Sequence, residues 1–327
     1  MATILDHGVA DKAKLAAILC CPRCKERLYE PNNASPNYAL ACCNSACALS
    51  RDGFPDIDGV PALVDFDNSI ISRDQCVASR ASSYKPRRRQ SLYQRLRAKL
   101  LREPNIQAQH FAKVFVTEAL ALHPNPTILV IGGGSIGSTR FLYEHPDITI
   151  VGSDIYCSPN TSIIADGHQL PLVNGSVHGV WIGAVLEHVL TPTDVVAEIH
   201  RVLVKNGVVF AESPFMQQVH EGPFDFTRFT LSGHRWLFRQ FDEIESCVCT
   251  GPSTVLIWSI RYYVASIFGS YKIGTIAALM FFWLRLIRPF QKRKFVVDGA
   301  SALMFLGRRS DHSLIPRDMV SYYSGAQ

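Results

Sequence analysis

A glycine-rich loop and a later carboxylate have the spacing of a nucleotide site. An apolar run over residues 128–131 leads into a loop that contains Gly132, Gly133, Gly134 and Gly137. Glycines suit a sharp turn after a strand because they adopt positive φ and put no Cβ in the way of a ligand. Asp154 ends the next apolar run, 20 residues after Gly134, where an acid can bind a ribose hydroxyl. The pattern predicts a nucleotide-like cofactor, with Ile155 beside the acid.

Two pairs of cysteines near the N-terminus have the spacing of metal ligands. Cys21 and Cys24 form one knuckle, and Cys43 and Cys47 follow about eighteen residues later. Two such knuckles supply the four thiolates of a tetrahedral Zn²⁺ site. We therefore expect structural zinc on Cys21, Cys24, Cys43 and Cys47, with Cys42 as the alternate to Cys43. A module that has kept its fold and lost the metal, or a set of merely buried cysteines, is the alternative.

A loop with polar and aromatic side chains follows the expected fifth strand, residues 208–213. Ligands of open parallel sheets bind beyond the carboxyl ends of the strands, so this loop should line a substrate pocket. His220 is the first candidate for a general base, because imidazole titrates near neutrality, and His188 is the second. Arg228 is a candidate anchor for an anionic group of the substrate. For each of the three, a loop-ordering hydrogen bond is the alternative role.

Several segments in a fixed order carry a family resemblance. They are the glycine loop, Asp154, Asp166-Gly-His-Gln-Leu-Pro171, residues 180–188 ending in Leu-Glu-His, and residues 198–207. Over about residues 108–250 the chain resembles the class I S-adenosylmethionine-dependent methyltransferases. The resemblance implies a Rossmann-like α/β fold, mostly parallel with an antiparallel last strand. It also implies S-adenosylmethionine as cofactor, with Asp154 on the ribose and Asp166 and Gly167 beside the adenine.

The chain departs from this family at two places. Val130 stands where the family usually has an acid that faces the methionine end of the cofactor. Val177-His178 replaces the usual Phe-Asp before the fourth strand. The first departure bears on how the methionine end is held, while the ribose acid and the glycine loop are unaffected.

The N-terminal segment carries a second resemblance. Residues 54–63, Phe-Pro-Asp-Ile-Asp-Gly-Val-Pro-Ala-Leu, are similar to the ending of small zinc-ribbon-like proteins that partner and activate methyltransferases. Residues 15–19 match the short leading helix of those proteins. We therefore expect a zinc-ribbon-like module over residues 1–66, a basic linker over 67–107 and a methyltransferase domain over 108–327.

The linker is strongly basic. It has nine Lys or Arg and no Glu between Arg80 and Arg102, and residues 91–102 show helical spacing with a leucine stripe. Such a helix can dock by its leucines, contact an anionic membrane or substrate, or bind RNA.

An apolar insertion at about 252–298 separates the last two expected strands, residues 241–249 and 301–307. Its longest apolar run, residues 273–284, is about a dozen residues, whereas a bilayer-spanning helix needs roughly 20. Basic residues follow the run, so the insertion reads either as a helical lid over the acceptor pocket or as an interfacial helix.

The composition is that of a folded protein, with 47% hydrophobic residues and a net charge of +5. The start of the chain lacks the pattern of a secretory signal. Six of the ten cysteines precede residue 48, which favours a metal site in a reducing cytoplasm over disulfides. We therefore expect a cytoplasmic protein, with peripheral contact to the inner face of the membrane as the alternative. We expect methyl transfer to a hydroxyl of a small molecule, sugar or lipid-linked glycan. An RNA methyltransferase and a non-catalytic scaffold are the alternatives.

Overall fold

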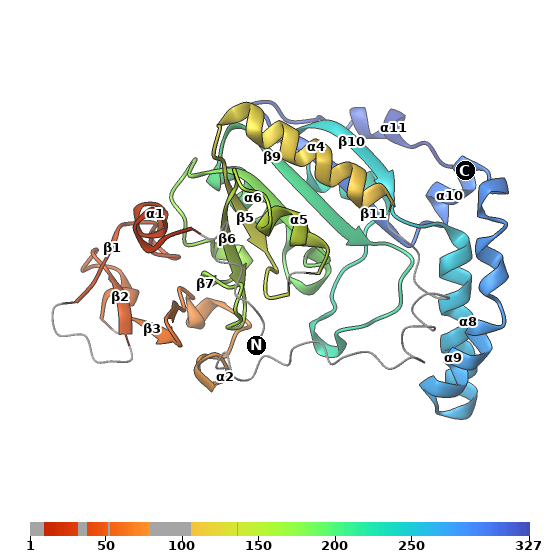
Figure 1. Ribbon diagram of the computed structural model, residues 1–327, viewed down its shortest axis with the longest axis horizontal. Helices are drawn as coiled ribbons and strands as arrows, with labels where there is room; N and C mark the ends of the chain where they lie inside the picture. Colours follow the sequence, from red (N-terminus) through yellow and green to blue (C-terminus); the bar gives the residue numbers. More distant parts are fainter. Residues whose placement is uncertain (1–9, 32–37, 52, 79–105, 136) are drawn as a thin grey trace.

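The computed structural model describes residues 10–31, 38–51, 53–78, 106–135 and 137–327 (Figure 1). The basic helix expected over residues 91–102 lies outside the described residues. So do most of the other positions of the basic linker.

A seven-stranded sheet forms the centre of the molecule, in the order β10-β11-β9-β8-β5-β6-β7. Its strands are β5 (Thr127–Ile131), β6 (Thr149–Asp154), β7 (Ile163–Ile164), β8 (Val177–Gly183), β9 (Leu203–Pro214), β10 (Phe241–Val248) and β11 (Ala302–Arg309). The pairs from β7 to β9 are parallel, and β11 is antiparallel to both β9 and β10. This arrangement confirms the expected Rossmann-like sheet, including the antiparallel last strand.

Helices cover both faces of this sheet, which explains its almost uninterrupted apolar strands. They are α4 (Ile106–Leu122), α5 (Arg140–Tyr143), α6 (Pro192–Val202) and α7 (Leu231–Leu237). Ile128 and Val130 of β5 are buried in a core with residues of α4 and α5. Leu129 and Ile131 are buried in the other core, with residues of α6 and α7. Successive side chains of one strand therefore fill two different cores, as the period of two in a strand requires.

A smaller antiparallel sheet lies at the N-terminal end. Its strands are β1 (Leu28–Tyr29), β2 (Tyr38–Cys42), β3 (Phe54–Ile57) and β4 (Val60–Pro61). The short helix expected before the first cysteine knuckle is α1 (Lys12–Ile18), and the side chain of Asp11 caps it by accepting from the Lys14 N–H at 2.7 Å. After β4 come η2 (Phe66–Asn68) and α2 (Arg73–Ala78).

The small sheet packs against the edge of the large one at β7 (Figure 1). The N–H of Leu63 donates to the carbonyl of Ile164 at 2.8 Å, which adds residues 62–63 to the edge of β7. The N–H of Cys20 donates to the carbonyl of Pro171 at 2.9 Å, and Lys25 pairs with Glu198 at 2.8 Å. Both sheets contribute to one apolar core, so the N-terminal module and the large sheet share their packing.

The apolar insertion is helical and connects β10 with β11. It consists of α8 (Pro252–Phe268), α9 (Tyr271–Leu279), η8 (Phe282–Arg285), η9 (Arg288–Phe290) and α10 (Arg293–Asp298). In Figure 1, α8 and α9 lie at the opposite end of the molecule from the small sheet. Among the described helices, none combines the length and apolar character that crossing a membrane requires. A last helix, α11 (Asp318–Tyr322), follows β11.

Candidate active site

The glycine loop is tied to the end of β6 by backbone hydrogen bonds. The N–H groups of Gly132 and Gly133 donate to the carbonyl of Ser153 at 2.9 and 3.0 Å. The N–H of Gly134 donates to the Asp154 carboxylate at 2.7 Å. The loop turns sharply because Gly132 has φ of +77°, a conformation that side chains rarely adopt. Only short helical turns follow the loop, η4 (Gly137–Thr139) and α5.

A side chain at Gly134 would have to displace Asp154 or Tyr156. A Cβ at this position would be 2.6 Å from Asp154 Oδ2 and 2.7 Å from the Tyr156 hydroxyl oxygen. The loop backbone can therefore approach the end of β6 only because the side chain is missing. Ile155 and Tyr156 are both exposed beside the acid and add apolar surface on which a nucleoside can pack. The end of β6 thus has the acid, the open backbone and the apolar wall that a nucleoside needs.

Asp154 is an unusual carboxylate because it is only 8% exposed. Burial raises its pKa to about 6, although hydrogen bonds from the N–H groups of Gly134, Ile155 and Tyr156 favour the charged form. The Ile155 N–H donates to Oδ1 at 2.7 Å. The acid is consequently held in one orientation at the strand end and is ionised at neutral pH.

Asp166 and Gly167 follow β7 and open the turn η5 (Gly167–Gln169). The Asp166 carboxylate accepts from the His168 N–H at 3.0 Å and contacts His168 Nδ1 at 2.6 Å. Its other oxygen accepts from the Ser69 hydroxyl. Burial alone would raise the pKa of Asp166, but the hydrogen bonds from His168 and Ser69 outweigh it and lower the pKa. Ser69 reaches this acid from the segment after the small sheet, a contact with no signal in the sequence.

Val130 is buried in β5 below the glycine loop. A Cβ added to Gly133 would be 3.3 Å from Val130 Cγ1, so this side chain packs directly under the loop. Val130 thus makes an apolar core position of the place where the class I methyltransferases usually have an acid.

Four cysteines of the small sheet converge, namely Cys21, Cys24, Cys42 and Cys47. Their sulfur atoms all lie within 4.8 Å of one another, with 3.9 Å between Cys21 and Cys47 and 3.4 Å between Cys24 and Cys42. A Zn–S bond of about 2.3 Å in a tetrahedron separates sulfurs by about 3.8 Å. The spacing of these thiols is therefore close to that of a four-sulfur zinc site.

Cys43 does not belong to this group, which corrects the first choice made from the sequence. Cys42 is buried at the end of β2, whereas Cys43 is exposed. Neighbouring side chains of an extended segment point to opposite sides, so only one of the two can face the cluster. The alternate, Cys42, is the one that the structure brings to Cys21, Cys24 and Cys47.

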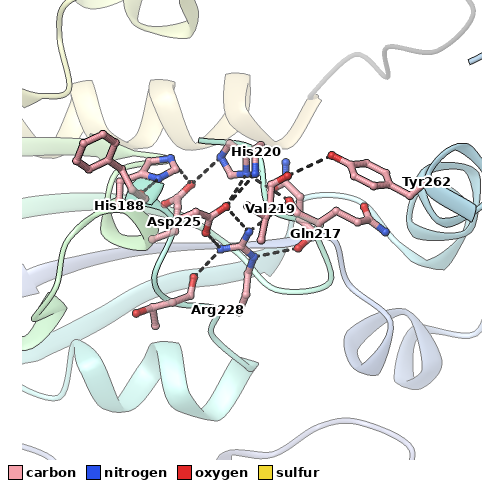
Figure 2. A network of polar contacts seen from close by, with 11 residues as sticks. His188, Gln217, Val219, His220, Asp225, Arg228 and Tyr262 are labelled. Atoms are coloured by element: carbon pink, nitrogen blue, oxygen red, sulfur yellow. Dashed lines mark hydrogen bonds and ion pairs between the residues drawn. The ribbon is translucent and has the colours of Figure 1, made fainter. Parts of the chain in front are cut away.

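A second convergence involves Glu187, His188 and His220, and Figure 2 shows the two histidines. Glu187 and His188 lie in the turn η6 (Leu186–His188) after β8, and His220 lies on the loop after β9. The Nε2 atoms of His188 and His220 are 3.7 and 3.8 Å from Glu187 Oε1. The two imidazole rings meet edge to face with centroids 4.9 Å apart. The structure thus brings both candidate bases to one point at the carboxyl ends of β8 and β9.

Arg228 orders the loop that carries His220. It pairs with Asp225 and donates to the carbonyls of Gln217, Gln218 and Thr227 at 3.0, 3.3 and 2.8 Å (Figure 2). The hydrogen bond from Arg228 lowers the pKa of Asp225 to about 2. Asp225 in turn accepts from the His220 N–H at 3.0 Å. These contacts support the loop-ordering role for Arg228 rather than that of a substrate anchor.

Glu187 is a site residue to which the sequence analysis assigned no role. Its side chain is 1% exposed, and its Oε2 has no hydrogen-bond partner among the described residues. Burial raises its pKa to about 7, and the nearby Asp225 and Glu212 act in the same direction against Arg228. Its place directly before His188, at the end of a predicted strand, was the available signal.

The cofactor side and this cluster are next to each other. A Cβ on Gly132 would be 2.5 Å from Val185 Cγ2, and Val185 directly precedes the turn that carries Glu187 and His188. Helix α8 also reaches the loop that follows β9, which we call the acceptor loop. The Tyr262 hydroxyl donates to the Val219 carbonyl at 3.2 Å (Figure 2), and the side-chain amide of Gln218 donates to the Ser259 hydroxyl at 3.3 Å. The apolar insertion therefore contacts the rim of the same site.

Comparisons with known proteins agree with this geometry. Residues 129–211 match the model of a family described as a methyltransferase domain. No curated protein matched the chain.

Similar solved structures include a putative sarcosine dimethylglycine methyltransferase from Galdieria sulphuraria, with 15% identity and a TM-score of 0.45, covering 63% of this chain and 86% of that chain. Another is a geranyl diphosphate C-methyltransferase from Streptomyces coelicolor A3(2), with 15% identity and a TM-score of 0.43, covering 70% of this chain and 84% of that chain. A third comes from the complex between the Haloferax volcanii Trm112 methyltransferase activator and the putative methyltransferase. It has 20% identity and a TM-score of 0.40, and the match covers 62% of this chain and 94% of that chain. Likenesses this distant do not indicate an acceptor.

The matched residues 129–211 run from β5 to β9 and include the glycine loop, Asp154, Asp166 and the turn with Glu187 and His188. This stretch of the chain is therefore similar to a methyltransferase domain, and the seven-stranded sheet that contains it has the Rossmann-like fold.

Proposed function

We propose that the protein transfers a methyl group to a hydroxyl of a small molecule, sugar or lipid-linked glycan. The observation that carries the proposal is the contact between the two halves of the site. Val185 joins the glycine loop to the turn of Glu187 and His188, so an acceptor bound at the cluster would lie beside the cofactor. The mixture of titratable groups and half-exposed rings at Phe224 and Phe226 suits an acceptor with polar and apolar parts.

On the cofactor side, the glycine loop and Asp154 would bind the ribose, and Asp166 and Gly167 would lie beside the adenine. S-adenosylmethionine supplies a methyl carbon that its sulfonium activates for in-line displacement. The protein must then align the acceptor and remove its proton. His220 is our first candidate base, because its Nδ1 faces Asp225 Oδ2 at 3.4 Å and its Nε2 remains turned toward the cluster. His188 is the second, with its Nδ1 held by the Phe224 carbonyl at 2.7 Å.

The acceptor class can be tested by comparing the metabolites of a deletion strain with those of its parent. The deletion extract should accept labelled methyl groups when the purified enzyme and S-adenosylmethionine are added. An RNA methyltransferase is the other candidate, which the basic residues 80–102 favour. Transfer to RNA should weaken steeply as salt rises, whereas transfer to a small hydroxyl acceptor should not.

We further propose that the four-cysteine cluster binds structural Zn²⁺ and that residues 1–66 act as a built-in partner of the methyltransferase domain. Two observations support this: the edge pairing of Leu63 with Ile164, and the hydrogen bond to Asp166 from Ser69, three residues beyond the module. A metal that stabilises the small sheet would thereby also stabilise the contacts around the adenine side of the site.

We propose peripheral contact with an anionic membrane through the insertion. Large apolar side chains are exposed along it, including Leu286 at 70% and Phe290 at 80% exposure. Arg288, Lys292 and Arg293 lie among them. Apolar and basic groups on one short helical segment are typical of interfacial binding, and such contact would bring the site to a lipid-linked acceptor.

The cofactor assignment predicts the effect of replacing Asp154. Loss of a charged hydrogen-bond partner costs about 1.5–3 kcal/mol, so Asp154→Ala should weaken S-adenosylmethionine binding at least about tenfold. Because burial raises the pKa of Asp154 to about 6, the carboxylate is charged above that pH, and wild-type affinity should fall as pH is lowered through 6. Tyr143, the other titratable group that interacts with Asp154, stays neutral over this range because its pKa is raised.

Titration calorimetry at several pH values measures both effects. The matched control is Asp147→Ala, which removes an exposed acid from the connection before β6. An unchanged affinity in folded Asp154→Ala would refute the assignment.

The zinc proposal predicts that Cys24→Ser releases the metal and lowers the thermal stability of the protein, because structural zinc contributes folding free energy. Cys43→Ser should keep both, since Cys43 is exposed and lies outside the cluster. Elemental analysis of protein purified without chelators and a thermal melt measure the two effects. Protein without zinc, or equal losses in the two variants, would contradict the proposed ligands.

The proposed role of His220 as general base predicts the effect of replacing it. General-base assistance is typically worth about 10²–10⁴-fold in rate, so His220→Ala should lower turnover of the identified acceptor by about that factor. Cofactor affinity should stay nearly unchanged, because His220 lies on the other side of Val185. His312→Ala removes an exposed histidine after β11 and should leave turnover unaffected. Turnover within about threefold of wild type, well below that range, would rule out His220 as the base.

The membrane proposal predicts that the full-length protein floats with vesicles of phosphatidylcholine and phosphatidylserine, and less with phosphatidylcholine alone. Phe290→Asp with Leu286→Asp should abolish flotation, because the apolar contact is lost and negative charge is added. Val320→Asp, at another strongly exposed apolar side chain, is the control. Equal flotation of the double variant would contradict the proposal. It would also be contradicted if wild type did not bind vesicles but formed concentration-dependent dimers that the double variant does not form.

A further inference from the structure

We propose that Glu187, His188 and His220 form a binding site for a divalent transition-metal ion on the acceptor side of the methyltransferase. The inference deepens the proposed function, on which it rests for the place where the acceptor binds. It adds a metal-binding activity, separate from the cysteine cluster. A bound ion would occupy the Nε2 atoms of both histidines, so it would replace the general-base role of His220, and its charge would favour the deprotonated acceptor hydroxyl.

The three side chains offer the right ligand types at the right separation. One carboxylate oxygen and two imidazole nitrogens lie within 4.8 Å of one another. Two histidines with one carboxylate are a ligand set for Zn²⁺, Fe²⁺ or Mn²⁺, whereas the four thiols of the small sheet favour metal ions that prefer sulfur ligands, such as Zn²⁺. Metal–ligand bonds of about 2.0–2.2 Å need only a small inward movement of these side chains.

The outer contacts of both histidines direct their Nε2 atoms toward the site. His188 Nδ1 is 2.7 Å from the Phe224 carbonyl oxygen, so this nitrogen carries the proton and Nε2 carries the lone pair. His220 Nδ1 faces the Gln218 carbonyl and Asp225 Oδ2, each at 3.4 Å. Metal-binding histidines characteristically give their second nitrogen to a carbonyl or a carboxylate in this way. Both free nitrogens then point to the same oxygen of Glu187.

The burial of the Glu187 carboxylate is not explained by a pair of hydrogen-bonded histidines alone. Its side chain is 1% exposed, and its Oε2 lacks a hydrogen-bond partner among the described residues. A buried carboxylate oxygen without a partner is costly, and the histidines face the other oxygen, Oε1. A cation held by both carboxylate oxygens would therefore satisfy Oε2 as well as bind the histidines. Arg228 does not neutralise Glu187 directly, because the hydrogen bonds found for its guanidinium go to Asp225 and to backbone carbonyls of the loop.

Three ligands from the described residues leave coordination positions open. A closed four-ligand site is structural, while a three-ligand site can take a further ligand from a substrate. The open side borders the acceptor loop and its half-exposed rings Phe224 and Phe226. An acceptor with oxygen donors next to the methylated hydroxyl would fit this site, and the cation would orient it.

The test is a titration with Mn²⁺ of the full-length protein that carries one equivalent of zinc, the amount that the four-cysteine cluster holds, followed by electron paramagnetic resonance of the free ion. Mn²⁺ prefers oxygen and nitrogen ligands and leaves the thiolate cluster occupied by zinc. Wild type should remove one equivalent of Mn²⁺ from solution. Glu187→Gln and His188→Ala should each weaken this binding by more than the 10–100-fold that loss of an outer contact typically costs.

Glu221→Gln is the matched control, since it removes an exposed carboxylate from the same loop and should bind Mn²⁺ as wild type does. Retained S-adenosylmethionine binding shows that each variant is folded. Absence of saturable Mn²⁺ binding in wild type, or equal binding in Glu187→Gln and His188→Ala, would overturn the site. If Mn²⁺ does not bind and His220→Ala still loses turnover, the metal is refuted and the proposed methyl transfer stands. If Mn²⁺ binds but the wild-type enzyme transfers no labelled methyl group to the deletion extract, the metal site stands and the proposed methyl transfer is refuted.

Discussion

The hydrogen bond from the Gly134 N–H to the Asp154 carboxylate connects the two strands on which the cofactor site depends. It is possible only because Gly134 has no Cβ, which would collide with the same carboxylate and with the Tyr156 hydroxyl. The loop is thereby held over the end of β6, and the acid is fixed with one oxygen toward the loop and one toward Ile155. A charged group that is nearly buried can be kept in place in this way, because backbone donors replace the water that it loses.

The same edge of the sheet also explains how the two modules form one structure. β7 has only two residues, and a strand edge left open would expose unpaired backbone groups. Residues 62–63 pair with it, and Ser69 then reaches Asp166 beside the expected adenine position. Covering the edge and shaping the cofactor side are therefore done by one continuous segment. This gives a physical reason for joining a cysteine-rich module to a methyltransferase domain in a single chain.

The acceptor side follows a different principle. It is built from a turn after β8 and a loop after β9, and the ion pair of Arg228 with Asp225 holds the loop in place. Because Arg228 is used in this way, our proposal assigns the recognition of an acceptor to Glu187, His188 and His220. Helix α8 borders the same loop through Tyr262 and carries part of the exposed apolar surface of the insertion, so a lid and a membrane contact are compatible roles for one segment.

The sequence by itself determined the Rossmann-like sheet and its antiparallel end, and it located the glycine loop and the acid at the end of β6, since these depend on local signals. Apolar runs of strand length, a glycine turn and an acid at a strand end are contiguous features with little freedom of arrangement. It also located both cysteine knuckles, but it could not choose between Cys42 and Cys43. That choice depends on which side of an extended segment faces the cluster, and a shift of one residue reverses it.

Only the tertiary structure decided the contacts between distant segments. Glu187 acquires its importance because β8 and β9 are neighbours, which brings His220 from 33 positions further along the chain. Ser69 meets Asp166 because the small sheet pairs with β7, and Arg228 is committed to its loop because the carbonyls around it converge. In each case the signal in the sequence is a common residue type without periodicity, and its partner is selected by the path of the backbone in space.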